Sequence, residues 1–419
     1  METKYQVLII GGGTAGIMVA AQLKKKRKEL QIAIVEPATK HYYQPAWTLV
    51  GGGAYDFQKT IKPMSDLIPR GVTWIQDSAA GFIPEKQQLK LASGKVIGYD
   101  FLVVAPGLVN DFSLIEGLED ALEKKVVCSN YVDPNETWRQ LQNFKGGHAL
   151  FTQPTTPIKC GGAPQKIMYL AAEYFAKNGL KEKTKITFAS PGSVIFGVKV
   201  IADSLMKVIE RHKIDFKPFH APIKIDADQK IAYFKDVQVK DNACMLNKGG
   251  NEEHEPIDGI VAMPFDFMHL APPQTAPRFV KNSTLANEAG WLNVNINSMQ
   301  HKEFPTIFGL GDVAGLPTAK TGAAVRKQAP VVVDNILKMM NKQEATNHSY
   351  EGYSSCPLVT GYGKMILAEF NYKNEFIPDP KLKRLFISDS SKEHWRLWMF
   401  KKVMLPYLYW NKMMKGKNV

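Results

Sequence analysis

The chain has 419 residues, too many for one compact core, which favours two domains with an appended segment. With 45% hydrophobic and 22% charged residues it has the composition of a globular protein, and a formal net charge of +13 favours an anionic partner. No motif of a nucleic-acid-binding module is present, so nucleic acid is not expected as a partner. The four cysteines are too scattered for a disulfide scaffold, and no spacing predicts a metal site.

Residues 5–36 carry the pattern of a dinucleotide-binding unit. The apolar run at 5–10 predicts a buried strand, the sequence GGGTAG occupies 11–16, and a helix is predicted at 17–26. A second strand is predicted at 31–35 and is followed by an acidic residue. A strand, a glycine-rich turn, a helix and a second strand in this order are much more specific for a dinucleotide than the glycines alone.

Each residue of the turn has a place in such a unit. Gly11 permits the tight turn, Gly13 lets the backbone approach a pyrophosphate, and Gly16 allows the helix to pack closely on the strand. Ala15 lies between them at the start of the helix, whose free N–H groups and positive dipole favour phosphate. Glu36 can hydrogen-bond the ribose hydroxyls and disfavours a 2′-phosphate. We therefore expect these residues to bind the nucleotide.

The next signal is a pair of cysteines in loops. Cys160 follows a predicted strand at 148–152, lies beside Lys159 and precedes a predicted helix, and these features predict a reactive thiol with a lowered pKa. Cys356 is expected in a second loop, with Pro and Gly on both sides and 196 residues from Cys160, unlike the CxxC pairs of other reductases. The alternative is that both are small buried apolar residues. Cys244 lies in a polar stretch and is expected to be incidental.

A second Rossmann-like unit is predicted between these cysteines, with a strand at 185–189 and a helix at 198–211. The sequence SPGS at 190–193 lacks the GxGxxG spacing, and the bulky side chains at 194–196 would crowd a pyrophosphate. We expect that the fold is kept while the nicotinamide site is lost. A flavin in this protein would then receive its electrons from a donor other than NAD(P)H.

Two further segments favour FAD as the dinucleotide. Residues 99–107 predict a strand that runs into a Pro-Gly turn, and residues 306–312 predict a strand that ends in glycines and a carboxylate. Both resemble signatures of the two-dinucleotide-domain flavoprotein reductases. The resemblance implies that Asp312 binds the ribityl chain of FAD. It also implies that the following helix, which carries Lys320 and Thr321, points its N-terminus toward the isoalloxazine. Alternatively, Asp312 simply caps that helix.

Five segments carry a more specific signal: YQPAWTLVGGG (43–53), TPIKCGGAPQKIMYLAAEYF (156–175), FGLGDVAGLPTAKTGAAV (308–325), SCPLVTGYGKMILAEF (355–370) and LPYLYWNKMM (405–414). They resemble sulfide:quinone oxidoreductase, in the branch that includes the mitochondrial enzyme, and the similarity covers almost the entire chain. The resemblance implies an α/β protein with two Rossmann-like dinucleotide-binding domains. It also implies FAD as cofactor and oxidation of hydrogen sulfide by membrane quinone. The presequence of mitochondrial members is missing, which indicates a bacterial-type protein.

The resemblance also assigns roles to residues. It implies that Cys160 and Cys356 form the redox pair beside the flavin, and that Gln44 and Ala79 contact FAD. Sulfide would attack the disulfide and leave a persulfide, usually on Cys356, and a thiolate on the partner. The sulfane sulfur would pass to sulfide, a thiol, sulfite or cyanide, and ubiquinone or menaquinone would reoxidise the flavin. Some members carry a third cysteine near Cys128, which is otherwise expected to be a structural thiol.

The C-terminus predicts contact with a membrane, where the quinone is dissolved. Residues 394–414 combine aromatic, apolar and lysine residues and predict two short amphipathic helices broken at Pro406. Alternatively, these residues cap the domain core or pack a dimer, which would make the protein a homo-oligomer. Tyr362 and Phe370, which follow Cys356, are expected to line the quinone pocket.

No apolar run approaches the ~18 residues that a transmembrane helix needs, and the first predicted strand leaves no room for a signal peptide. We therefore expect a protein that is made in the cytoplasm and is bound peripherally to the inner membrane of the cell.

The expected domain organisation is discontinuous. Residues 1–110 and 285–345 would form the FAD domain, 111–284 the second domain, and 346–419 the C-terminal region. Three other functions remain open: a type II NADH:quinone dehydrogenase, a flavocytochrome c sulfide dehydrogenase, and a non-catalytic flavin-binding redox sensor. The first needs an intact second glycine motif, and the second would normally carry an export signal.

Overall fold

The computed structural model describes residues 3–236, 259–346 and 350–417. Its first sheet has seven strands in the order β5-β2-β1-β8-β7-β6, with β18 paired beside β8. The neighbours of β1 and the β8–β18 pair are parallel, whereas β6, β7 and β8 pair antiparallel. The strands are β1 (Lys4–Ile10), β2 (Ile32–Val35), β5 (Val72–Ile75), β6 (Ala79–Ile83), β7 (Gln88–Leu91), β8 (Val96–Val104) and β18 (Ile307–Gly309).

Two helices from opposite ends of the chain pack on this sheet and on each other. They are α1 (Thr14–Lys26) and α8 (Gly322–Met340). Residues 15–23 of α1 are all buried, whereas three lysines occupy its last turn, where cations complement the helix dipole. Thr321 caps α8 by accepting a hydrogen bond from the Ala324 N–H. The predicted strand–turn–helix–strand unit is confirmed, with both strand boundaries within one residue and the helix beginning three residues earlier than predicted.

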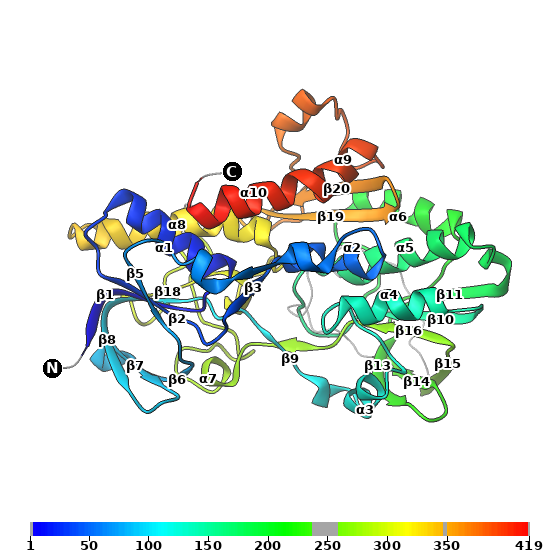
Figure 1. Cartoon of the computed structure of the whole chain (residues 1–419), viewed down its shortest axis with the longest axis horizontal. Helices are drawn as coiled ribbons and strands as arrows, with labels where there is room; N and C mark the ends of the chain where they lie inside the picture. The colour runs from blue at the N-terminus through cyan, green and yellow to red at the C-terminus, as the bar shows by residue number, and fades with distance from the viewer. Residues whose placement is uncertain (1–2, 237–258, 347–349, 418–419) are drawn as a thin grey trace.

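The second sheet is wholly parallel, in the order β12-β11-β10-β16. Three helices belong to this part of the chain, and an antiparallel sheet of three strands lies beside it. In Figure 1 the first sheet is at the left and the second at the right. The elements are β10 (Gly147–Thr152), β11 (Thr184–Ala189), β12 (Asp215–Lys217), β16 (Phe267–Leu270), α4 (Pro134–Asn143), α5 (Ala163–Lys177), α6 (Lys199–Arg211), β13 (Ala221–Asp226), β14 (Ile231–Lys235) and β15 (Ile260–Pro264).

Two nucleotide-binding-type sheets therefore confirm the predicted α/β class. The proposed domain boundaries stay a prediction, although the strands of the first sheet come from both ends of the chain and those of the second from its middle. Further short elements are β3 (Lys40–Tyr42), β4 (Ile61–Pro63), β9 (Val109–Asn110), β17 (Gln274–Thr275), α2 (Trp47–Gly51), α3 (Leu118–Glu123) and α7 (Arg278–Lys281). Of these, α3 packs on β13 and α7 packs on β6.

The C-terminal region is a hairpin followed by a long helix that crosses both parts (Figure 1). Strand β19 (Ser354–Gly361) pairs with β20 (Lys364–Phe370) and packs on α5. The helix comprises α9 (Trp395–Met399), a π-helical turn (Phe400–Met404) and α10 (Leu405–Asn411).

The predicted break at Pro406 is wrong. Pro406 lies in the first turn of α10, directly after the π turn, so the helix continues through it. Within the described residues, no helix is long and apolar enough to cross a bilayer.

Candidate functional site

The two candidate redox cysteines meet although they are 196 residues apart in the sequence. Cys160 lies in the turn before α5, and its Sγ is 3.6 Å from the Sγ of Cys356. The prediction that Cys356 lies in a loop is wrong, because it is in strand β19, paired with Ala368. Gly162 permits the approach, since a Cβ there would lie 2.7 Å from Cys356 Sγ. The turn before α5 and strand β19 therefore bring the two sulfurs close together.

A buried lysine distinguishes the two sulfurs. Lys166, in the first turns of α5, is 2% exposed and donates a 2.8 Å hydrogen bond from Nζ to Cys160 Sγ. The pKa of Cys160 is held well below its usual value, although the thiol is buried. The main cause is the hydrogen bond with Cys356, followed by the positive charges of Lys166 and Lys401. The hydrogen bond with Cys160, together with burial, raises the pKa of Cys356. The Lys166 hydrogen bond therefore favours negative charge on Cys160 over Cys356.

Lys401 is a second buried cation near the pair, and the π turn of the C-terminal helix carries it. Its Nζ donates to the Pro45 carbonyl at 3.2 Å. Burial, with the charge of Lys166, lowers the pKa of Lys401 to about 7, while the cysteine charges oppose the shift. π turns often occur at functional positions, because they redirect a side chain from the regular helical spacing. Lys166 lies in the segment 156–175 and Lys401 in the segment 394–414, but the sequence assigned neither lysine a role beside the cysteine pair.

The lysines that the sequence did single out, Lys159 and Lys320, lie on the next part of the same site. Their backbones form a bridge, and the Cys160 N–H donates to the Lys320 carbonyl at 2.8 Å. Lys159 Nζ donates to the Gln44 side chain at 2.7 Å. Lys320 Nζ donates to the carbonyl of Asp312 at 2.6 Å, and burial lowers its pKa to about 8. The segments predicted to contact the flavin therefore adjoin the cysteine pair.

The glycine turn has the shape that a dinucleotide needs. Gly11 has φ +99°, and a Cβ there would lie 2.3 Å from the Ala105 carbonyl oxygen. A Cβ on Gly16 would lie 1.9 Å from the Gly11 carbonyl oxygen, whereas a Cβ on Gly13 would meet nothing within 4 Å. The N-terminus of α1, beside Ala15, is thus open to a phosphate.

Polar groups that suit the ribose and ribityl hydroxyls lie beside this turn. The Glu36 carboxylate accepts a hydrogen bond from the N–H of Gly12 at 2.7 Å, which fixes it at the end of β2. The Asp312 carboxylate makes no hydrogen bond or ion pair with any other residue that the structure describes. Thr321, not Asp312, caps α8, so the alternative role of Asp312 as that cap is wrong. A small cavity reaches from Gly311 along this segment. These residues fit FAD.

The C-terminal helix also reaches the glycine turn. The Tyr409 hydroxyl is 2.7 Å from Thr14 Oγ1 and 2.6 Å from His41 Nε2, and His41 Nδ1 is 3.0 Å from the Gly12 carbonyl oxygen. Burial lowers the pKa of His41, which favours the neutral imidazole. The helix that carries Lys401 is therefore fixed to the turn expected to bind the pyrophosphate.

The remaining candidates lie elsewhere. Cys128 is buried, donates to the Met268 carbonyl at 3.4 Å and has a pKa raised by burial, as a structural thiol would. Ala79 begins β6 and pairs with Leu91, and its contact with FAD stays a prediction. Cys244 lies outside the described residues.

The two residues predicted to line the quinone pocket lie in different apolar clusters. The ring of Tyr362 packs edge-on against Trp398, with its hydroxyl donating to the Gly52 carbonyl at 2.6 Å. Phe370 is buried and packs edge-on against Phe196. A shared quinone pocket of Tyr362 and Phe370 stays a prediction.

The loop after β11, where a second nucleotide would be expected, turns two of its bulky side chains into the core. Ile195 and Phe196 are buried in the same core cluster as Phe370. Gln165 donates to the Ile195 carbonyl at 2.6 Å and fixes this backbone. Because these two side chains face the core, the structure does not support their crowding of a pyrophosphate, and the loss of the nicotinamide site stays a prediction from the missing glycine spacing.

Residues 5–145 match the family model of pyridine nucleotide-disulphide oxidoreductases. The chain is 40% identical to the mitochondrial sulfide:quinone oxidoreductase of Mus musculus over 99% of this chain and 87% of the mouse protein. It is 39% identical to the mitochondrial sulfide:quinone oxidoreductase of Dictyostelium discoideum, over 100% of this chain and 87% of the Dictyostelium protein. The structure of sulfide:quinone oxidoreductase from Aquifex aeolicus has a TM-score of 0.78 at 20% identity, covering 99% of this chain and 92% of that chain, which shows a common fold. The chain therefore belongs to the sulfide:quinone oxidoreductase family.

Proposed function

We propose that this protein oxidises hydrogen sulfide to sulfane sulfur and transfers the electrons to a membrane quinone. Membership of the family supports this function, and so does one geometric observation. The sulfurs of Cys160 and Cys356 are 3.6 Å apart, with the ammonium of Lys166 2.8 Å from one of them. A close pair of cysteines with unequal pKa values is suited to thiol–disulfide exchange.

FAD is the cofactor of this family. The open glycine turn would hold its pyrophosphate, Glu36 its adenosine ribose, and Asp312 its ribityl hydroxyls. When bound, FAD supplies an acceptor for the two electrons of sulfide and a donor to quinone. The peptide between Lys159 and Lys320 would keep the cysteine pair beside the flavin end of this site.

The asymmetry of the pair sets the direction of the first step. HS⁻ attacks the disulfide at Cys356, the sulfur–sulfur bond breaks, and Cys160 leaves as a thiolate. Lys166 stabilises that thiolate, and the cysteine with the lower pKa is the better leaving group. The new persulfide is then on Cys356, in agreement with the expectation from the family.

The second step removes the sulfane sulfur. A nucleophilic acceptor, which can be a second sulfide, a thiol, sulfite or cyanide, takes the outer sulfur of the Cys356 persulfide. This transfer leaves two reduced cysteines, and their oxidation to the disulfide releases two electrons. Lys166 and Lys401 offset the negative charge while both sulfurs are reduced. The final electron acceptor is ubiquinone or menaquinone.

Access to a membrane-dissolved quinone is supported by an apolar stripe on the C-terminal helix. Every fourth side chain along it is an exposed apolar or aromatic one: Trp395, Met399, Val403 and Tyr407. The aromatic residues predicted for the membrane divide into two groups, because Trp398, Tyr409 and Trp410 are buried against the protein. Only the exposed stripe is available to a lipid surface, or to a second copy of the chain.

Anaerobic assays with alternative electron donors and acceptors test the function. The proposal predicts sulfide-dependent reduction of a short-chain quinone and no NADH-dependent reduction, because the loop after β11 lacks the GxGxxG spacing of a nucleotide site. NADH-dependent turnover without sulfide turnover would favour a type II NADH dehydrogenase. Turnover with cytochrome c but not quinone would favour a flavocytochrome partner. Flavin reduction without turnover would favour a redox sensor.

A further inference from the structure

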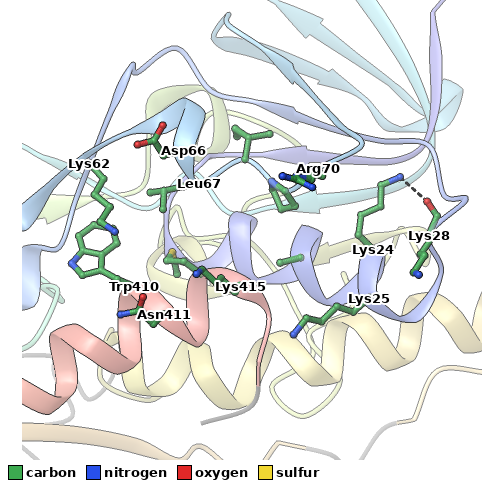
Figure 2. Close-up of a pocket in the computed structure, with 14 residues that line it drawn as sticks. Lys24, Lys25, Lys28, Lys62, Asp66, Leu67, Arg70, Trp410, Asn411 and Lys415 are labelled. Atoms are coloured by element: carbon green, nitrogen blue, oxygen red, sulfur yellow. Dashed lines mark hydrogen bonds between the residues drawn. The ribbon is translucent and has the colours of Figure 1, made fainter.

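A pocket of about 540 Å³ lies between the end of α1, the segment at 66–70 and the last turns of the C-terminal helix (Figure 2). Neither redox cysteine lines it. Three separate parts of the chain supply its cations. The positively charged residues that line it are Lys24, Lys25, Lys28, Lys62, Arg70 and Lys415. The lysines at and just beyond the end of α1 thus line a concave surface.

The positive charge of this basic pocket is not neutralised from within. Asp66 is the one carboxylate among its lining residues. Within the described ranges, none of the six cations forms an ion pair with a carboxylate. Burial and the charge of Lys417 lower the pKa of Lys25, as expected where cations crowd together. Such a pocket attracts a ligand with more than one negative oxygen.

The floor of the basic pocket is apolar. Leu67 and Met414 line it, and both are buried. Trp410 also lines it, with Lys62 Nζ 4.9 Å above its ring. A cationic rim over an apolar floor suits a ligand that has both a phosphate and a hydrocarbon part.

The position of the pocket identifies the source of that ligand. The exposed apolar stripe includes Met399, Val403 and Tyr407 at intervals of four residues. Asn411 continues the interval, and Lys415 follows in the next turn, and both line the pocket. The basic pocket therefore lies at the C-terminal end of the stripe, where α10 ends at Asn411 and Lys415 follows in a 3₁₀ turn. A headgroup would lie there if the stripe entered a bilayer.

We propose that the basic pocket binds the phosphate-bearing headgroup of an anionic membrane lipid. The inference rests on the proposed function only in taking the apolar stripe as the side that faces the membrane. The stripe would provide contact with any bilayer, and the pocket would add a preference for anionic lipid and fix the orientation of the C-terminal helix on the surface.

The test compares the full-length holoprotein in two charge-matched triple variants. One carries Lys25→Gln, Arg70→Gln and Lys415→Gln, all at exposed positions in the pocket. The control carries the same loss of charge at exposed lysines of the second part of the chain: Lys181→Gln, Lys183→Gln and Lys207→Gln. Binding is measured by co-sedimentation with vesicles of phosphatidylcholine alone or mixed with phosphatidylglycerol, and sulfide-dependent reduction of a water-soluble quinone shows that each variant is folded and active.

The proposal predicts that the pocket variant loses roughly 30- to 100-fold of its affinity for the anionic vesicles and retains its weak binding to neutral ones. The control should lose less than about 3-fold. Lys415→Glu alone should weaken anionic binding and provides a second variant with one change. Equal losses in both triple variants would show that only net charge matters and would overturn the proposal. Binding of inorganic phosphate as tight as that of the vesicles would overturn the lipid assignment. A wild type that binds the anionic vesicles but does not reduce quinone with sulfide would contradict the proposed function and leave the pocket proposal standing.

Discussion

Replacing Lys166 with methionine should slow the reduction of the flavin by sulfide. Lys166 is 2% exposed and its Nζ lies 2.8 Å from Cys160 Sγ. Methionine has a similar length and removes both the charge and the hydrogen bond. A hydrogen bond to a charged group contributes about 1.5–3 kcal/mol. Since about 1.4 kcal/mol is a factor of ten in rate, Lys166→Met should slow formation of the Cys160 thiolate roughly 10- to 150-fold.

The assay is anaerobic stopped-flow mixing with sulfide, following the loss of flavin absorbance. Lys181→Met, at an exposed lysine just beyond α5, is the matched control and should react at the wild-type rate. Because Lys166 lowers the pKa of Cys160, alkylation of the reduced variant should also need a higher pH than that of the wild type. A folded, FAD-loaded Lys166→Met that keeps the wild-type rate and alkylation profile would refute the role of Lys166.

Three further predictions concern other contacts of the site. Gly13→Ala should fold normally but bind FAD at least about tenfold more weakly, because its Cβ would project into the open phosphate site; Gly81→Ala, which also meets nothing within 4 Å, should keep its FAD content. The Lys401 charge is present below pH 7 and is lost as the pH rises through about 7, so the wild-type to Lys401→Met ratio of flavin-reduction rates should fall from roughly 3–10 at pH 6 toward 1 at pH 8.5; a constant ratio would contradict this role. Tyr409→Phe should cost about 1–3 kcal/mol in the free energy of unfolding measured with urea, because two buried hydrogen bonds are lost, whereas Tyr407→Phe on the exposed side should be nearly neutral, and equal effects would exclude the hydrogen bonds as the cause.

Local sequence was sufficient for the first dinucleotide unit. The spacing predicts the close approach of Gly16 to the Gly11 carbonyl within the turn, whereas the close approach at Gly11 is to Ala105, directly after the neighbouring strand β8, which the local pattern does not name. The resemblance to a known family supplied the pairing of Cys160 with Cys356, which spacing alone left open. The structure adds why the pair is unequal, since Lys166, in the first turns of the helix that follows Cys160, donates a hydrogen bond to Cys160.

The errors came from tertiary context. Cys356 is followed by proline and glycine, which predict a loop, but pairing with β20 makes the segment a strand. Pro406 was expected to end a helix, but the preceding π turn allows the helix to continue. Lys401 lies near the cysteine pair only because the C-terminal helix packs across the chain and is held against Thr14 and His41 by Tyr409. No local pattern encodes such a long-range placement.

The most direct test of the account is the flavin spectrum of the wild type, Cys160→Ser and Cys356→Ser, mixed anaerobically with sulfide and then with a short-chain quinone. Cys128→Ser is the matched control, because that thiol is buried and bonded to the Met268 carbonyl. The account predicts prompt bleaching and recovery with quinone in the wild type and in Cys128→Ser, and neither in the two variants of the pair. Wild-type flavin that stays oxidised with sulfide but is bleached by NADH, or bleaching by sulfide that survives in both variants of the pair, would contradict it.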